Sequence, residues 1–251
     1  MADTAGAWPR LPPVDAELAR RLLREGDVDV LGRMPWSSNA TFLVNLAGER
    51  GDGELLAIYK PQRGERPLWD FARGTLCRRE VAAFVVSEAL GWQIVPDTVL
   101  RDGPAGPGMV QRFVHHDPEE HYFTLLERYP DDFRKMAAFD VVINNTDRKG
   151  GHCLLSEEGR VFGIDHGISF HAQWKLRTVI WDFAGEPLPP PLCHDLMRLL
   201  DALEGEAGEE LRTLLDRFEL DALCARTRGL LAKRTLPAAD PGYHAFPWPL
   251  V

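Results

Sequence analysis

The chain has 251 residues and a mass of 28.2 kDa, which is enough to bury a substantial core in one domain or in two small lobes. Its formal net charge of -9 at pH 7 argues against a nucleic-acid-binding protein, whose contacts depend on clustered Lys and Arg, and does not favour docking on acidic lipid. The N-terminus has no basic region followed by an apolar one, and no run of about 18 apolar residues occurs, so we expect no secretion signal and no stable membrane insertion.

The cysteines indicate the compartment. They are scattered along the chain without CxxC pairs, which favours reduced thiols over a disulfide framework or a zinc site. We therefore expect a cytoplasmic protein whose free thiols are Cys77, Cys153, Cys193 and Cys224.

The first part of the chain predicts an antiparallel sheet preceded by one helix. Residues 1–13 are rich in Pro and Ala and predict a loose arm. Asp15 is a helix N-cap, and the helix that follows is expected over 16–25, with Gly26 as its stop. Alternating apolar segments separated by turn residues then predict three strands joined as a meander, over 28–34, 41–46 and 55–60.

A change of composition near residue 114 predicts a boundary between two lobes. Before it, a helix is expected over 78–90, then strands over 95–100 and 109–114. After it, the sequence becomes mostly helical, with helices expected over 130–142, 193–203, 207–218 and 221–233. We thus predict an α+β fold with an N-lobe over 1–114, which carries the arm and first helix, and a C-lobe over 115–251.

Two acidic residues mark the segment around which the chain is organised. The apolar run that ends at Ile143 leads into a polar, glycine-rich loop containing Asp147, and a predicted strand pair then ends at Asp165. One such carboxylate accepts the proton of an attacking hydroxyl and another holds magnesium in phosphoryl transfer. The alternative is that each Asp only caps a turn.

The motifs around these aspartates support a family resemblance. Asn145-Thr146-Asp147-Arg148 and Ile164-Asp165-His166-Gly167 together resemble the catalytic and metal-binding loops of the phosphatidylinositol 3/4-kinase superfamily. The likeness is greatest to type II phosphatidylinositol 4-kinases, and HipA-type protein kinases are more distant relatives. The resemblance implies a two-lobed, protein-kinase-like fold, with Asp147 and Arg148 as catalytic residues and Asp165 as the main metal ligand.

The sequence departs from the family pattern five residues after Asp147. The family normally has a magnesium-binding Asn there, whereas this chain has His152. An imidazole binds divalent cations, but magnesium prefers oxygen ligands, so the metal is either Mg²⁺ or Mn²⁺. The same replacement motivates the alternative of a pseudokinase that binds nucleotide for regulation. His115, His116 and His121 are read as a solvated loop in preference to a second metal cluster.

Lys60 and Glu80 are predicted to help bind nucleotide. Lys60 ends an apolar strand, and kinases use such a Lys on the α- and β-phosphates and hold it with a Glu on the next helix. Glu80 lies on the helix expected next. Taken separately, each residue is better explained as a solvent-exposed strand end or helix face, but the pair in this order along the chain favours the functional interpretation.

Two further stretches complete the predicted nucleotide site. Ser37, Ser38 and Asn39 occupy the place of a phosphate-covering loop but lack GxGxxG, and that stretch alone is better explained as an ordinary turn. Gln111, Phe113 and Val114 resemble the hinge of type II phosphatidylinositol 4-kinases, whose backbone pairs with adenine; the alternative is a plain buried strand.

We therefore predict an ATP- and metal-dependent phosphotransferase that moves the γ-phosphoryl group to a hydroxyl on a lipid headgroup, small molecule or protein. The alternatives are a HipA-like protein kinase or a nucleotidyltransferase, and the pseudokinase. Lys175 and Arg177 lie where the family carries its acceptor-binding loop, though packed cations explain them equally well. The scarcity of Lys relative to Arg favours a bacterial source with a GC-rich genome.

Overall fold

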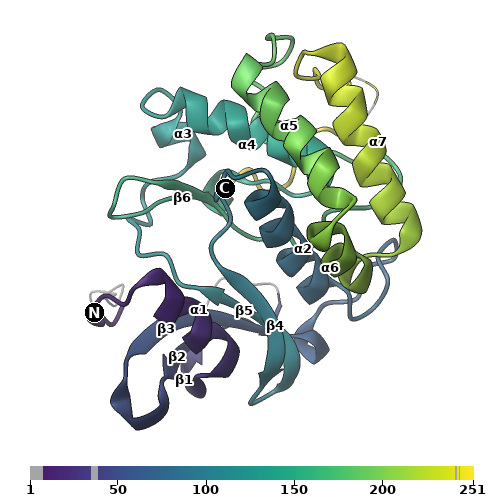
Figure 1. The fold of residues 1–251 in the computed structure, drawn as a ribbon. Coiled ribbons are helices and arrows are strands. Elements are labelled where there is room, and N and C mark those ends of the chain that lie inside the picture. Colours follow the sequence, from purple (N-terminus) through teal and green to yellow (C-terminus); the bar gives the residue numbers. More distant parts are fainter. Residues whose placement is uncertain (1–7, 35–38, 241, 243) are drawn as a thin grey trace. The chain divides into compact units, whose positions relative to one another are not determined.

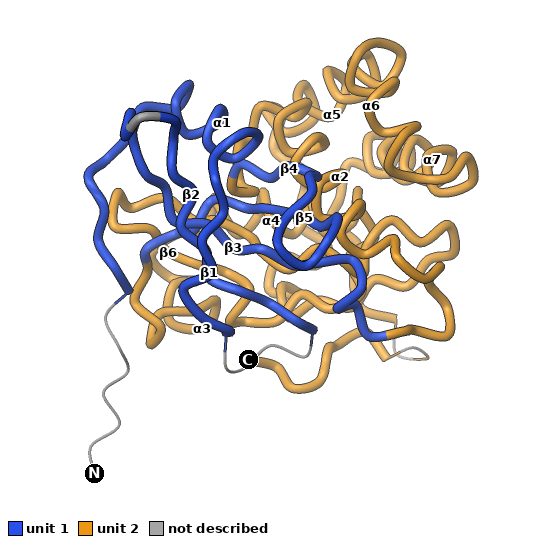
Figure 2. Tube along the Cα trace, turned by 90° about the horizontal axis from the view of Figure 1, so that it is seen from below, with its two compact units in different colours: residues 1–66, 97–115 blue, residues 67–96, 116–251 orange. Residues whose placement is uncertain are grey.

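The structure of this protein is a computed structural model that describes residues 8–34, 39–240, 242 and 244–251. The chain forms two compact units, shown in different colours in Figure 2. Unit 1 contains residues 1–66 and 97–115, and unit 2 contains residues 67–96 and 116–251. The predicted boundary at residue 114 lies beside the third and last point at which the chain passes from one unit to the other. Residues 67–96, which we had assigned to the N-lobe, are part of unit 2.

Unit 1 is built on a five-stranded antiparallel sheet with strand order β1-β2-β3-β5-β4. The predicted meander of the first three strands is confirmed, with boundaries shifted by a residue or so. The last two strands are joined by a tighter turn than expected, at which Gly106 has a positive φ of 97°. The strands are β1 (Asp27–Arg33), β2 (Phe42–Ala47), β3 (Glu54–Pro61), β4 (Thr98–Gly103) and β5 (Gly106–Arg112).

Helix α1 (Ala16–Glu25) covers one face of this sheet and has the predicted boundaries (Figure 1). Asp15 caps it by accepting a hydrogen bond of 2.8 Å from the Leu18 N–H, and Gly26 ends it. Ala19, Leu22 and Leu23 of its apolar stripe are buried on the sheet, and Leu18 is partly buried. The resulting core contains Ala19, Leu22, Leu23, Val44, Leu46, Leu55, Ala57, Tyr59 and Val110.

The opposite face of the sheet carries the strand residues of the predicted nucleotide site. Because side chains alternate along a strand, Leu56, Ile58 and Lys60 of β3 point away from the α1 side, where Ala57 and Tyr59 lie. Part of the N-terminal arm that we expected to be loose packs here. Trp8 makes an edge-to-face contact with Phe113, with ring centroids 5.4 Å apart.

Unit 2 is mainly helical, as predicted, and its short β-hairpin is confirmed. A short helix, α3, was not predicted. Among the described residues no helix is long and apolar enough to cross a membrane. The elements are α2 (Leu76–Ala89), α3 (Tyr122–Leu125), α4 (Pro130–Ile143), β6 (Cys153–Leu155), β7 (Val161–Gly163), α5 (Pro190–Leu203), α6 (Glu206–Leu214) and α7 (Arg217–Lys233), with 3₁₀ turns at Glu49–Gly51 and Gln62–Gly64 in unit 1 and at Gly150–His152 here.

Helix α4 delivers the first acidic segment. Pro130 occupies its first turn, where the missing N–H costs nothing, and Asn144 ends it in the left-handed conformation, with φ 53° and ψ 56°. The last turns of α4 are almost entirely buried and include a carboxylate, Asp140, whose exposure is 0%. A buried carboxylate requires compensating partners, and these come from the loop that follows.

Candidate active site

Two loops of unit 2 carry the predicted catalytic and metal-binding residues. We call residues 144–152 the first acidic loop and residues 164–170 the second acidic loop. Backbone hydrogen bonds join them directly: the Thr146 N–H donates to the Ile168 carbonyl at 3.1 Å, and the Phe170 N–H donates to the Ile143 carbonyl at 2.6 Å. The first acidic loop is also bonded on its other side, where the Arg148 N–H donates to the Arg177 carbonyl at 3.0 Å.

Arg148 and Asp140 form a buried ion pair behind the first acidic loop. Both side chains are 0% exposed, and Nη2 of Arg148 lies 3.0 Å from Oδ1 of Asp140. Asn145 donates to the same carboxylate from its side chain at 3.0 Å, and the Thr178 hydroxyl donates at 3.1 Å. The carboxylate of Asp140 is therefore well satisfied, which a buried charge needs.

The other donors of Arg148 reach towards the second acidic loop. Its Nη1 donates to the carbonyls of His152 at 3.3 Å and Ile164 at 3.0 Å, and Nη2 lies 2.7 Å from Nε2 of His166. We had predicted Arg148 among the catalytic residues. The structure pairs its guanidinium with Asp140 of helix α4 and leaves no exposed part to meet a substrate.

Asp147 lies on the accessible side of the first acidic loop. Its side chain is 27% exposed, and Oδ2 lies 3.5 Å from Nζ of Lys149. Burial raises the pKa of Asp147 to about 6; the nearby charge of Asp165 adds to this rise, while Lys149 and Arg177 oppose it. A carboxyl group with such a pKa is close to the range that suits proton acceptance near neutral pH.

His152 and Asp165 face each other across the two loops. Nε2 of His152 lies 3.4 Å from Oδ2 of Asp165, whose side chain is 50% exposed. Asp165 has a positive φ of 62°, a conformation that is uncommon for residues other than Gly and is found at functional sites. Within the described parts of the chain, no group of three or more His, Cys, Asp and Glu side chains is arranged to hold a metal ion. Other ligands of an ion bound by His152 and Asp165 would therefore have to be of another kind.

Glu80 supports the second acidic loop from helix α2. Its side chain is 2% exposed, and Oε2 accepts a hydrogen bond of 2.8 Å from the backbone N–H of His166, the residue after Asp165. Glu80 thus lies in unit 2 with the two acidic loops, whereas its predicted partner, Lys60, lies in unit 1. The pairing of Glu80 with Lys60 stays a prediction.

Three residues of the predicted nucleotide site gather on one face of the unit 1 sheet. Lys60 pairs with Met109 across β3 and β5, and Ile58 pairs with Gln111, so Lys60 and Gln111 share a face with Leu56. Gln111 is buried and donates to the Thr98 hydroxyl at 2.9 Å. Phe113 is buried beside them.

The structure describes the predicted hinge residues but only one residue of the predicted phosphate loop, Asn39. The Phe113 N–H already donates to the Leu56 carbonyl at 3.0 Å, so this N–H is engaged within the sheet, and adenine pairing through residues 111–114 stays a prediction. Ser37 and Ser38 lie outside the described residues. Asn39 accepts a hydrogen bond of 2.8 Å from the Arg66 N–H through its side chain, which joins two segments of unit 1 that are 27 residues apart.

The segment after the second acidic loop is held by buried polar groups. Asn144 donates from its side chain to the carbonyls of His171 at 2.8 Å and Gln173 at 2.7 Å, and it accepts from the Lys175 N–H at 2.9 Å. The ammonium of Lys175 lies 2.7 Å from Asp70. Burial alone would raise the pKa of Asp70, but the bond and charge of Lys175 outweigh it and lower that pKa below its usual value.

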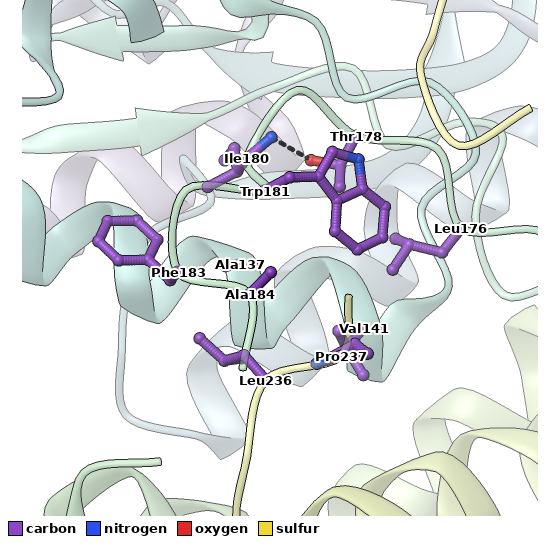
Figure 3. Close-up of a pocket in the computed structure, with 10 residues that line it drawn as sticks. All are labelled: Ala137, Val141, Leu176, Thr178, Ile180, Trp181, Phe183, Ala184, Leu236 and Pro237. Carbon is purple, nitrogen blue, oxygen red and sulfur yellow. Dashed lines mark hydrogen bonds between the residues drawn. The ribbon is translucent and has the colours of Figure 1, made fainter. Parts of the chain in front are cut away.

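A pocket of unit 2 is lined in part by the stretch that follows this segment, residues 176–184 (Figure 3). Asp147 and Asp165 are not part of its described lining, which is largely apolar, so the pocket does not represent the acidic site. The lining comprises Ala137, Val141, Leu176, Thr178, Ile180, Trp181, Phe183, Ala184, Leu236 and Pro237.

The sequence-based prediction missed two residues that shape the site, Asp140 and Asn144. Asp140 was included in the run Phe139 to Ile143 without a role, although a charge inside a buried helix requires a partner and Arg148 follows eight residues later. Asn144 was treated as loop chemistry. Asn144 ends a helix and is followed by another polar residue, and neither feature indicates that its side chain binds residues 171–175, about 30 positions away.

Comparisons with known proteins agree with this architecture. The family model for phosphatidylinositol 3- and 4-kinase matches residues 98–218, which include both acidic loops. Protein Rv2133c of Mycobacterium tuberculosis (strain ATCC 25618 / H37Rv) is 40% identical over 263 residues, covering 91% of this chain and 94% of that protein.

Solved kinase structures share the fold at low sequence identity. Hydra Fam20 with sugar has a TM-score of 0.54 at 14% identity, with 88% of this chain and 90% of that chain covered. The Golgi casein kinase with Mn/ADP bound has a TM-score of 0.53 at 14% identity, covering 94% of this chain and 80% of that chain. The predicted two-lobed, protein-kinase-like α+β fold is confirmed. The chain belongs to the same family as Protein Rv2133c, and its match to the phosphatidylinositol 3- and 4-kinase model agrees with the resemblance that its sequence predicted.

Proposed function

We propose that this protein is a kinase that uses ATP with a divalent metal ion and transfers the γ-phosphoryl group to a hydroxyl acceptor. The observation that carries the proposal is the grouping of Asp147, His152 and Asp165 on two loops joined by one buried arginine. Asp147 and Asp165 are near enough for the charge of one to raise the pKa of the other. The match of residues 98–218 to the phosphatidylinositol 3- and 4-kinase model supports phosphoryl transfer in general.

Asp147 is assigned the role of orienting the acceptor hydroxyl and accepting its proton. Its pKa of about 6 leaves the carboxylate mostly ionised at pH 7 and still basic enough to take part in proton transfer. Its partial exposure gives an acceptor access to the carboxylate oxygens. Arg148 is assigned a positioning role. Its buried guanidinium holds the two acidic loops together but is not exposed to solvent, so it does not contact the substrate.

Asp165 and His152 are assigned to the metal ion. Two ligands at about 2.1 Å from one ion, set at a right angle, are about 3 Å apart, so the observed 3.4 Å between Nε2 and Oδ2 fits a shared ion after a small adjustment. The donor set of one carboxylate and one imidazole suits Mn²⁺ as well as Mg²⁺. A bound ion supplies neutralisation of the phosphate charges, and phosphate oxygens complete its ligand set.

The nucleotide is assigned to the face of the unit 1 sheet that carries Lys60. Lys60 contacts the phosphates in this proposal, and Gln111, Phe113 and Val114 form the wall and hinge for the base. Glu80 orients Lys60 and, as its bond to His166 indicates, also holds the second acidic loop.

Cations near Asp147 favour an anionic acceptor. Lys149 and Arg177 both oppose the rise in the pKa of Asp147, so both place positive charge where the acceptor hydroxyl is proposed to lie. Lys175, in contrast, is engaged with Asp70 and stacks over Trp69 at 5.0 Å from the ring centroid. A phosphorylated headgroup, a phosphorylated small molecule or an acidic peptide has the required charge.

Transfer of radiolabel from ATP tests the reaction type. Candidate acceptors of these three classes are incubated with ATP labelled at the γ- or the α-phosphate, with Mg²⁺ or Mn²⁺. Transfer of the γ-label supports the proposed kinase. Transfer of the α-label identifies a nucleotidyltransferase, and tight nucleotide binding without either transfer identifies a pseudokinase, the alternative that His152 favours; both results would overturn the proposal.

A further inference from the structure

The C-terminal segment, residues 244–251, makes hydrogen bonds at two places near Asp147. One is the stretch 177–181, which supports the first acidic loop, and the other is Gly150 in that loop. At its start, the Thr178 N–H and the indole Nε1 of Trp181 both donate to the Ala245 carbonyl, at 3.0 Å and 3.2 Å. Arg177, whose carbonyl accepts the Arg148 N–H, also donates from its side chain to the His244 carbonyl at 3.2 Å. The segment therefore rests on the strip of chain that supports the first acidic loop.

The end of the same segment returns to the first acidic loop itself. The Gly150 N–H donates to the Leu250 carbonyl at 2.7 Å, between Asp147 and His152 in the sequence. A Cβ atom placed on Gly150 would lie 3.4 Å from that carbonyl oxygen and 3.0 Å from the ring of Phe123. The approach is thus close enough that glycine suits this position.

Backbone bonds hold the segment together with a few apolar contacts, among them the buried Pro247 and the edge contact of Phe246 with Trp181. Ala245 is 5% exposed, but Phe246 is 53% and Trp248 88% exposed, so most of the large side chains contribute little buried area. A segment that depends on a few hydrogen bonds is sensitive to the loss of any one of them.

We propose that residues 244–250 form a clasp that holds the first acidic loop in the shape needed for catalysis. One end fixes residues 177–178 against the loop, and the other fixes Gly150 within it, so the turn that presents Asp147 is held from two sides. Asp147 itself needs no contact with the clasp; residues 244–250 are positioning residues. The kinetic part of this inference rests on the proposed function, whereas the structural part does not.

The substitution Gly150→Pro removes the one N–H that binds Leu250 and suits the local backbone. Gly150 opens a 3₁₀ turn, a position that tolerates proline, and Lys149 before it is extended, with φ -94° and ψ 164°. The matched control is Gly150→Ala, which adds the same Cβ against Phe123 but keeps the N–H. The difference between these two variants reports the loss of the contact with Leu250, because in proline the ring Cδ replaces the N–H and also pushes against the Leu250 carbonyl.

Amide exchange and steady-state kinetics of the full chain test the clasp. In Gly150→Pro we expect the amides of Thr178 and Arg148 to exchange about 10-fold faster than in Gly150→Ala, because the bonds to Ala245 and Arg177 loosen. Turnover should fall about 10-fold with the KM for ATP within twofold of the control. Equal exchange in the two variants, or faster exchange with unchanged turnover, overturns the proposal.

A second variant acts at the other end of the clasp and keeps the test decisive if Gly150→Pro does not fold. Trp181→Phe removes the bond to the Ala245 carbonyl far along the chain from Asp147, and we expect about threefold faster exchange at Thr178 and Arg148 with lower turnover. Unchanged exchange in Trp181→Phe then counts against the clasp. If the unmodified protein transfers no phosphate, the proposed function fails while the exchange rates still decide whether the clasp exists.

Discussion

Asp147 combines partial burial with nearby charges of both signs, and this mixture sets its proton affinity. Its pKa of about 6 lies above the ordinary value of 3.8, so Asp147 binds its proton more tightly in the folded protein than a carboxyl group in water does, although it is still mostly ionised at pH 7. If the ionised carboxylate is the active form, turnover should rise with pH through about 6. The acid limb of the pH profile therefore reports on Asp147 and on the charges beside it.

Lys149 offers a test of this assignment. It opposes the rise in the pKa of Asp147, so Lys149→Met should raise that pKa further and move the acid limb of turnover to higher pH. We expect turnover at pH 6, relative to that at pH 8, to fall about twofold against the unmodified protein. Lys149→Arg, which keeps the charge, should leave the profile in place. A profile that does not move in Lys149→Met would show that Asp147 does not set it.

Arg148 is expected to contribute mainly to stability and alignment. Removing it in Arg148→Met leaves the Asp140 carboxylate charged and buried, which should lower the free energy of unfolding by about 3–5 kcal/mol. The double variant Asp140→Asn with Arg148→Met should lose less than the sum of the two single variants, because it removes both charges. Chemical denaturation measures all four free energies, and strictly additive losses would contradict the ion pair.

At the scale of elements, helix α2 reaches the second acidic loop through Glu80. Glu80→Gln keeps an oxygen that accepts the His166 N–H, whereas Glu80→Ala removes it. If Glu80 only holds this loop, metal affinity falls in Glu80→Ala and stays within about twofold in Glu80→Gln. If it also orients Lys60, as proposed, Glu80→Gln should raise the KM for ATP severalfold. Calorimetric metal titration together with the KM values separates the two roles.

The elements themselves were largely predictable because their signals are local. Helix α1 has an N-cap at Asp15 and a stop at Gly26, and both lie within its own stretch of sequence. The hairpin of β6 and β7 follows from alternating residues on either side of a turn at Gly159. Short α3 lacks such a repeat, since four residues give no helical periodicity to read.

The candidate site was predictable only where it is continuous in sequence. Asp147, His152 and Asp165 belong to two adjacent loops, and the structure brings His152 and Asp165 together. The partner of Arg148 is fixed by how α4 packs against the loop, and the contact of Leu250 with Gly150 joins positions 100 residues apart. Side-chain identity gives no sign of a backbone bond at such separation.

Across the whole molecule, nucleotide and metal together should stabilise the folded state. A ligand that binds only the folded state stabilises it by about 2.7 kcal/mol at 100 times its Kd. We expect ATP with Mg²⁺ or Mn²⁺ to raise the midpoint of thermal unfolding by several degrees, and ATP with a chelator to have a much smaller effect. Equal shifts with and without metal would argue against the ligand role of Asp165 and His152.

The central claim is that Asp165 serves metal-nucleotide binding while Asp147 serves the transfer step. Calorimetric titration of metal-ATP, paired with turnover of the γ-label, tests this division most directly in Asp165→Ala and Asp147→Asn. The account predicts that Asp165→Ala loses metal-dependent nucleotide binding, whereas Asp147→Asn binds within about twofold of the unmodified protein and turns over about 10²-fold or more slowly. Retained turnover in both variants would contradict it.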